Sequence, residues 1–337
     1  MQASNPIDQD VASVLDVAAG FWRSQVLFTG VKLGLFTLLA QEPSTREEIV
    51  RRLNLDLAVT GDLLDALVAI GLLHRADGRY RNSAVVAACL DESKPTYVGG
   101  FLKFMSRALY PQWSSLTDLA RTGEVQKNSD AFRDLYADAA RIREFMSAMD
   151  CASMPVVLEL TKRFPWADHH TFVDLGGARG NLAGHLVKAH DHLTGVCLDL
   201  PVLEPVFREH MHALSTGDRV TFRGADFLVD PLPEADVLIF GHVLHDWNEK
   251  TRVALLRRAF DAVKSGGAVV IYDEMIDDDR SGPAHNLLMS LNMRIVRAGA
   301  AEYTAAECRS WLSEAGFTDF SIEDLTATER LVVARKR

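Results

Sequence analysis

Two histidines in the segment HVLHDWN, residues 242–248, are candidates for acid–base chemistry. The apolar run VLIF precedes them and predicts a buried strand, so His245 should lie just beyond the carboxyl end of that strand. Histidine has an ordinary pKa of ~6.5 and can accept a proton near neutral pH. A base at His245 is therefore one interpretation, with His242 as a packing neighbour. The other is that His245 caps a helix beginning near Asn248.

An imidazole base works best when its second nitrogen is held by an acceptor that also stabilises the imidazolium. Two carboxylates are available for this role. Asp273 ends a predicted strand in IYDEMI, and Glu302 follows the helical segment LLMSLNMRIV. Glu274 takes the place of Asp273 if the strand register differs by one residue. Ordinary solvated carboxylates are the alternative at both positions.

A glycine-rich loop stands at the end of another predicted strand, in FVDLGGARG, residues 172–180. Glycines at 176, 177 and 180 allow a tight turn and a close approach of the backbone to a ligand. The loop lacks the GxGxxG spacing of dinucleotide sites, and no Gly-Lys-Ser/Thr follows as in a phosphate-binding loop. The pattern indicates a nucleotide-type site of another kind.

Acidic residues follow two further predicted strands. Asp199 lies about 20 residues after the glycine loop, where a carboxylate can accept hydrogen bonds from both ribose hydroxyls. Asp226 and Phe227 follow the next strand and offer a carboxylate for an adenine amino group and a ring for its face. All of these positions are carboxyl ends of parallel strands, where open α/β sheets bind ligands. Glycines that merely turn and aspartates that merely cap helices are the alternative.

The motifs VDLGGARG, LDLP, GADF and HVLHDWNE, in this order, resemble the S-adenosylmethionine-dependent O-methyltransferases of the caffeate and acetylserotonin type. The resemblance covers nearly the whole chain. It implies S-adenosylmethionine as cofactor, S-adenosylhomocysteine as product, and His245 as the base between Asp273 and Glu302. We expect no metal, because the glycine loop and the strand-end aspartates suffice for the cofactor and the sequence has no Cys/His ligand cluster. The cofactor residues that it implies are Asp174, Gly176, Gly177, Gly180, Asp199, Leu200, Asp226, Phe227, Gly241, His242 and Trp247.

The chain departs from the family pattern in two places. Ala178 and Arg179 replace the commoner Gly-Thr or Gly-Ser of the loop, and Gly241 stands where plant members usually have a lysine that contacts the cofactor. We therefore expect local differences in cofactor geometry.

Apolar and sulfur-containing side chains at helical spacing are predicted to line the acceptor pocket, by the same resemblance. They lie in REFMSAMD and LLMSLNMR and comprise Phe145, Met149, Met289, Asn292 and Met293, with Met146 as a weaker candidate. Methionine and phenylalanine at such spacing are also common in plain hydrophobic cores.

The elements that must position these residues form an α/β domain over residues 166–337, a Rossmann-like methyltransferase fold. Strands are predicted at residues 171–175, 195–200, 220–224, 236–241 and 268–273, mostly separated by amphipathic helices. Their continuous apolar character is typical of a parallel sheet covered on both faces. One long helical excursion follows, and FTDFSI and RLVVARK close the chain as an antiparallel pair.

The segment before residue 165 is mostly helical. Residues 1–100 have a winged-helix-like order, with a capping box at Ser44 and Glu47, a helix at 59–70 and a hairpin at 72–81 around Asp77-Gly78. The predicted recognition helix carries acidic residues and no lysine or arginine, which disfavours DNA binding. By resemblance this domain mediates homodimerisation, and the nearly uncharged residues 11–28 agree with that. A helical linker that contributes to the pocket is predicted at 101–165.

Composition excludes several other classes of protein. The chain has 337 residues, 48% of them hydrophobic, and a formal net charge of -10, which disfavours bulk nucleic-acid binding. No signal-peptide pattern and no run of ~20 apolar residues occurs, so we expect a soluble, cytoplasmic protein without membrane contact. Four widely spaced cysteines fit neither a zinc cage nor a disulfide scaffold.

Three alternatives to phenol O-methylation stay open from the sequence. An N-methyltransferase needs only modest base assistance, and relatives of this fold also hydroxylate, decarboxylate or catalyse pericyclic steps. A ligand-sensing winged-helix regulator is a non-enzymatic alternative, opposed by the acidic recognition helix. The acceptor molecule is not determined, because pocket shape depends on many apolar side chains and on the partner subunit.

Overall fold

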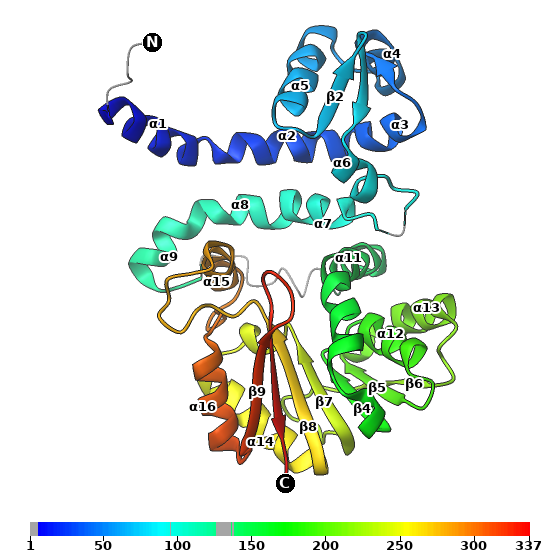
Figure 1. Cartoon of the computed structure of the whole chain (residues 1–337), viewed down its shortest axis with the longest axis vertical. Coiled ribbons are helices and arrows are strands. Elements are labelled where there is room, and N and C mark those ends of the chain that lie inside the picture. Colours follow the sequence, from blue (N-terminus) through cyan, green and yellow to red (C-terminus); the bar gives the residue numbers. More distant parts are fainter. Residues whose placement is uncertain (1–5, 95, 126–135, 137) are drawn as a thin grey trace. The chain divides into compact units, whose positions relative to one another are not determined.

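The computed structural model describes residues 6–94, 96–125, 136 and 138–337. It has two units, Met1–Pro111 and Gln112–Arg337 (Figure 1). Part of the predicted linker, residues 126–135 and 137, lies outside the described residues. Among the residues that are described, no helix has both the length and the hydropathy needed to cross a membrane.

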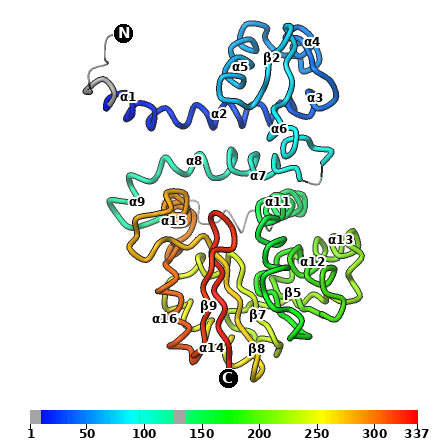
Figure 2. Tube along the Cα trace, in the orientation of Figure 1, coloured from blue at the N-terminus to red at the C-terminus, as the bar shows by residue number. Residues whose placement is uncertain are grey.

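The first unit is built from helices and one small antiparallel sheet. The helices are α1 (Pro6–Ala18), α2 (Gly20–Lys32), α3 (Leu35–Gln41), α4 (Arg46–Leu53), α5 (Leu57–Ala69), α6 (Ala84–Cys89) and α7 (Gly99–Phe104), followed by a π-helical turn (Met105–Leu109) and α8 (Tyr110–Gln112). Helices α3, α4 and α5 and the strands enclose a core that includes Phe36, Ile49 and Leu64. Figure 2 shows α1 lying apart from this core.

The predicted wing is confirmed. Strands β2 (Leu73–Ala76) and β3 (Arg79–Asn82) pair antiparallel, and the short β1 (Ser44–Thr45) adds to β3. The positive φ angles of Asp77 and Gly78 close the two-residue turn. The capping box, however, is one residue later than predicted: Thr45 caps α4, and the side chain of Glu48 accepts from the Thr45 backbone N–H.

The second unit contains a seven-stranded sheet in the order β6-β5-β4-β7-β8-β10-β9. The first five strands in chain order are parallel, and the last two form the predicted antiparallel pair. Their bounds are β4 (Thr171–Leu175), β5 (Thr194–Asp199), β6 (Val220–Gly224), β7 (Ala235–Gly241), β8 (Val263–Asp273), β9 (Asp319–Asp324) and β10 (Arg330–Arg335). Each of the five predicted parallel strands is present, and β8 begins five residues earlier than predicted.

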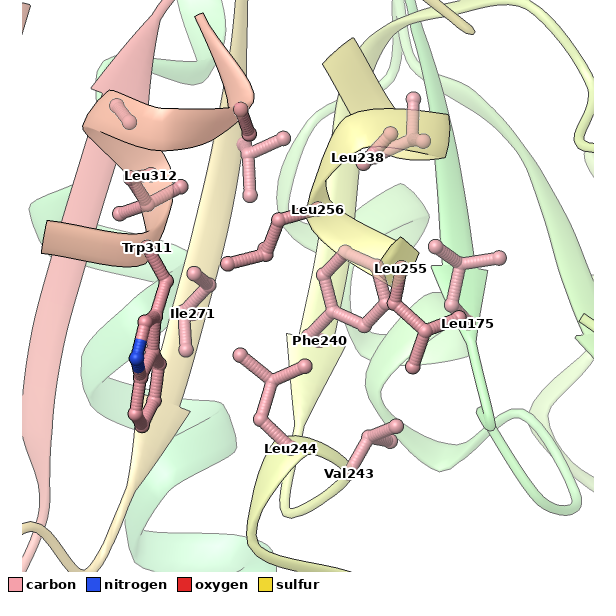
Figure 3. Packing of buried hydrophobic residues seen from close by; sticks show 14 of the residues in the cluster. Leu175, Leu238, Phe240, Val243, Leu244, Leu255, Leu256, Ile271, Trp311 and Leu312 are labelled. Atoms are coloured by element: carbon pink, nitrogen blue, oxygen red, sulfur yellow. The ribbon is translucent and has the colours of Figure 1, made fainter. Parts of the chain in front are cut away.

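Helices cover both faces of this sheet (Figure 1). On one face lie α14 (Glu249–Ala262) and α16 (Ala305–Ala315), and on the other α11 (Ala139–Arg163), α12 (Asn181–Ala189) and α13 (Glu204–Leu214). Figure 3 shows the first core, where Leu255 and Leu256 of α14 and Trp311 of α16 meet Phe240 and Ile271 of the sheet.

The other helices among the described residues of this unit are α9 (Leu116–Thr122) and α15 (Ala284–Val296), with short 3-10 turns at Trp113–Ser115, Trp166–Asp168, Pro201–Leu203 and Leu244–Asp246. The helical excursion predicted after the fifth parallel strand is present and consists of two helices, α15 and α16. Thr304 caps α16 with a capping box to Glu307.

Candidate active site

The carboxyl ends of four parallel strands bring the predicted site residues to one edge of the sheet. Strand β4 lies between β5 and β7, and β8 lies beside β7. In register, Leu175 faces Leu198 and Phe240, and Gly241 faces Tyr272. The glycine loop, Asp199, the HVLHDW segment and Asp273 consequently gather there, although up to about a hundred residues separate them in the chain.

The glycine loop turns back on its own strand. Gly176 has φ +70°, and a Cβ at this position would lie 2.8 Å from the side chain of Val243. Its N–H donates to the carbonyl of Leu198. A Cβ at Gly177 would lie 2.6 Å from the carboxylate of Asp174. Larger side chains at these two positions would therefore displace the loop.

Asp199 is fastened to the loop by backbone donors. Its Oδ2 accepts from the Ala178 N–H at 2.8 Å, and its Oδ1 accepts from the Leu200 N–H at 2.7 Å. Each oxygen keeps a second lone pair for a ligand. Burial, and next the charge of Asp199, raise the pKa of Asp174 to about 7, so Asp174 is a structural partner of the loop that carries a proton part of the time at neutral pH.

Asp226 forms a local turn, because its Oδ1 accepts from the Leu228 N–H at 2.9 Å. Phe227 meets Trp247 edge-to-face, with ring centroids 6.2 Å apart. The guanidinium of Arg297 covers Trp247 at 3.9 Å from the ring centroid. Trp247 Nε1 is buried without a hydrogen-bond partner among the described residues. Such an orphaned donor is costly unless a ligand satisfies it.

Gly241 is the last residue of β7 and His242 follows it, but the two residues have different surroundings. A Cβ at Gly241 would lie 2.0 Å from the ring of Tyr272, so packing against that ring requires glycine here. His242 has φ +52° and lies edge-on to Tyr272. Its Nε2 is 3.8 Å from Oε1 of Glu329, a buried residue of the loop between β9 and β10.

His245 contacts both predicted carboxylates. Its Nδ1 lies 2.7 Å from Oε1 of Glu302 and 3.5 Å from Oδ1 of Asp273. Both carboxylate side chains are fully buried, and the imidazole is 12% exposed. The hydroxyl of Tyr303 donates to the other oxygen of Asp273. Asn248 caps α14, so the alternative of His245 as a helix cap does not hold.

The carboxylates dominate the proton affinity of His245. Burial alone would lower its pKa, but the charges of Glu302 and Asp273 and the hydrogen bond to Glu302 outweigh burial and raise the pKa to about 10. Burial raises the pKa of Asp273 to about 6, against the opposing charge of His245. Glu274 instead points to His285, at 3.3 Å. The two buried carboxylates thus stabilise the protonated form of His245 relative to the neutral form.

The predicted pocket residues lie on two helices. On α11, Ile142 and Met146 are buried in a small cluster with Leu203 and Val206, whereas Phe145 and Met149 are only partly buried. On α15, Met289 is partly buried and Met293 is buried. Asn292 is oriented by Trp113, whose Nε1 donates to its Oδ1 at 3.1 Å.

The sequence did not predict the contacts that three polar side chains make in this region. Arg179 donates to the buried Asp150 of α11, so the loop residue noted as a departure ties the loop to that helix. Trp113 precedes any recognisable motif and gave no signal. Arg252 could not be distinguished by sequence from the other charged residues of α14.

The donor set of His245, Asp273 and Glu302 has potential ligand atoms within 4.8 Å of one another. A metal requires a deprotonated imidazole. Because Nδ1 already faces Glu302 at 2.7 Å and the pKa is raised to about 10, a proton competes for this position at neutral pH. The absence of a metal remains a prediction.

Comparison with known proteins shows to which family this chain belongs. Residues 113–318 match the O-methyltransferase domain, and residues 15–92 match the O-methyltransferase dimerisation domain. This chain belongs to the O-methyltransferase family. The dimerisation domain of the family coincides with the segment in which the sequence alone left DNA recognition open.

Individual members of the O-methyltransferase family match nearly end to end. The tetracenomycin polyketide synthesis 8-O-methyl transferase TcmO of Streptomyces glaucescens is 46% identical over 325 residues, 96% of each chain. The N,N-dimethyltransferase OxyT of Streptomyces rimosus is 38% identical over 310 residues, 90% of each chain. The structure of human N-acetylserotonin methyltransferase in complex with SAM has a TM-score of 0.90 at 31% identity, covering 100% of this chain and 99% of the other.

Proposed function

We propose that this O-methyltransferase moves a methyl group from S-adenosylmethionine to a hydroxyl of a small aromatic, phenolic metabolite. The observation that carries the proposal is the buried His245 held between Glu302 and Asp273. The name of TcmO, an 8-O-methyl transferase of polyketide synthesis, supports oxygen as the acceptor atom.

The residues at the strand ends fit S-adenosylmethionine, which supplies a methyl group on a positively charged sulfur. The close approach of backbone at Gly176, the free lone pairs of Asp199 and the unsatisfied Nε1 of Trp247 suit a nucleoside with hydroxyl and ring-edge groups. By resemblance, Asp226 and Phe227 would contact its base. These residues bind and orient the cofactor without a metal in this proposal.

His245 would then hold the acceptor hydroxyl and its proton. The neutral form of His245 is the form that accepts this proton. Because the pKa of His245 is raised to about 10, close to the ~10 of a phenol, the transfer costs little free energy. Since Nδ1 faces Glu302, Nε2 is the nitrogen left for the hydroxyl. The Glu302 and Asp273 carboxylates stabilise the imidazolium that forms.

In this proposal, the rest of the rate acceleration comes from holding the acceptor oxygen and the methyl donor in the reactive orientation. Oriented groups reach effective molarities of about 10⁵ M or more, worth several kcal/mol. Phe145, Met149, Met289 and Met293 would shape a water-poor wall, and Asn292, held by Trp113, would present a fixed amide. Such a wall suits a reaction in which opposite charges neutralise each other.

We further propose a homodimer built by the first unit. Helices α1 and α2 expose Val14, Leu15, Val17, Phe21 and Trp22. Isolated exposed apolar residues are ordinary, but a contiguous set on one projecting helix pair marks an interface. The match of residues 15–92 to a dimerisation domain supports this.

Incubation with methyl-labelled S-adenosylmethionine and a panel of phenols, catechols and aromatic amines tests the function. We expect transfer to hydroxyls, unchanged after treatment with a chelator. Transfer to amines alone would favour N-methylation, the second candidate, for which the similarity to OxyT is the specific observation. Consumption of the panel without methyl transfer would favour the non-methylating chemistry of this fold.

A further inference from the structure

Arg252 of α14 is a buried cation near the site, with only 5% of its surface exposed. Its Nε donates to the carbonyl of Leu244 at 2.8 Å, and its Nη2 donates to the carbonyl of Ala301. No described carboxylate forms an ion pair with it. A buried guanidinium with carbonyl partners alone is costly, so its position calls for a specific explanation.

The two carbonyls belong to the residues that immediately precede His245 and Glu302. A third bond joins the same segments, because the Ala301 N–H donates to the His245 carbonyl at 2.9 Å. The rigid, planar guanidinium spans both carbonyls at once, which an ammonium group cannot do in the same geometry. Arg252 therefore sets the separation of the backbones that carry the base and its partner.

The faces of the guanidinium are also in contact. Its central carbon lies 4.6 Å from the ring centroid of Tyr303 and 5.0 Å from that of Trp311. The hydroxyl of Tyr303 donates to Asp273. Figure 3 shows Leu244 and Trp311 among the packed side chains of this core. The contacts of Arg252 thus extend to both carboxylate partners of His245.

We propose that Arg252 is a positioning residue, which holds His245 and Glu302 at hydrogen-bonding distance through the Leu244 and Ala301 carbonyls. The consequence for catalysis rests on the proposed methyl transfer. The effect of Arg252 on the His245–Glu302 contact does not rest on the proposed function, because that contact exists without any ligand.

The test compares Arg252→Lys and Arg252→Met with matched changes at Arg258. Arg258 lies on the same helix and also donates to two backbone carbonyls, those of Leu228 and Asp230. All four variants lose the same kind of bonds, but only those at 252 should disturb His245. Arg252→Lys keeps the positive charge, and it provides the test if Arg252→Met does not fold.

The first readout is NMR of labelled histidine in the cofactor-free protein, with the His245 signal assigned from His245→Gln. In Arg252→Lys we expect the titration midpoint of His245 to fall by at least one pH unit, because the Glu302 contact loosens while charge is kept. The Arg258 variants should lower the melting temperature but leave the His245 midpoint in place.

The second readout is kinetic, with a phenol methylated in the panel. Arg252→Lys should lower kcat at least tenfold and keep the affinity for S-adenosylhomocysteine within threefold. An unchanged His245 midpoint in both Arg252 variants would overturn the proposal. Because the NMR readout needs no acceptor, a failure of the proposed function and a failure of the Arg252 assignment are distinguishable.

Discussion

The Nδ1 atom of His245 lies 2.7 Å from Oε1 of Glu302, although 57 residues separate the two in the chain. The turn after β7 supplies the imidazole, and the segment between α15 and α16 supplies the carboxylate. With Nδ1 held in this way, the ring orientation is fixed and one nitrogen remains for a substrate proton. The catalytic predictions below depend on this contact.

Loss of His245 should affect rate and not cofactor binding. His245→Ala and His245→Gln should lower kcat by ~10²–10⁴, the usual range for a positioned general base. Raising the pH toward the pKa of the phenol should partly restore both variants, because a preformed phenolate needs no base. Calorimetry with S-adenosylhomocysteine should give an unchanged affinity.

The matched control for this change is His285→Gln, since His285 also lies beside a carboxylate, Glu274, but is exposed. This variant should keep the wild-type kcat. Near-wild-type rates in both His245 variants at neutral pH, with a phenol of pKa ~10, would show that the base assignment is wrong.

The titration of His245 should be displaced strongly upward in the cofactor-free protein. Its pKa is raised to about 10 by the two carboxylates, against the effect of burial, so NMR should find the midpoint far above the ordinary ~6.5. A midpoint near 6.5 would contradict the ion-paired arrangement.

The same shift has a consequence for stability. Because the pKa is higher in the folded state, the stabilisation from the His245 ion pairs is fully present below pH ~6.5 and is lost as pH rises through about 10. The stability advantage of wild type over His245→Gln, measured by urea unfolding, should therefore shrink between these two values. A constant difference across this interval would argue against the linkage.

Removal of the Asp199 carboxylate should weaken cofactor binding. Asp199→Ala deletes the acceptor of the Ala178 and Leu200 amides and the proposed ribose contacts. A lost charged hydrogen bond worth ~1.5–3 kcal/mol corresponds to about tenfold or more in Kd. Calorimetry with S-adenosylhomocysteine measures it, and Asp191→Ala, at a side chain that is 99% exposed, is the control. Equal affinities of the two variants would remove Asp199 from the site.

Charges on the projecting helices should disrupt the dimer. Leu15 and Trp22 are exposed on α1 and α2, and Leu15→Lys/Trp22→Lys would bury two charges in the proposed interface. Sedimentation should find a dimer for wild type and a monomer for this variant at micromolar concentration. Val59→Lys on α5, equally exposed in the first unit, should stay dimeric. A monomeric wild type would contradict the proposal.

Much of the second unit could be predicted from sequence because strand signals are local. The continuous apolar runs VLIF and VVIY lie in β7 and β8, and the glycine loop lies directly after β4. Since parallel strands end at one edge, placing Asp199, His245 and Asp273 together needed only the order of the strands. The choice between Asp273 and Glu274 needed the register of β8, which local pattern does not determine.

Tertiary structure alone decided the remaining features, because they depend on segments distant in sequence. The pKa of His245 follows from burying two carboxylates around it, and Arg252 gains its role only when α14 packs against the Leu244 turn and the segment ending at Ala301. The tie between Arg179 and Asp150 likewise needs α11 to lie over the loop. Sequence by itself determined which groups could do chemistry and at which edge; the packing of helices on the sheet decided their distances, charges and partners.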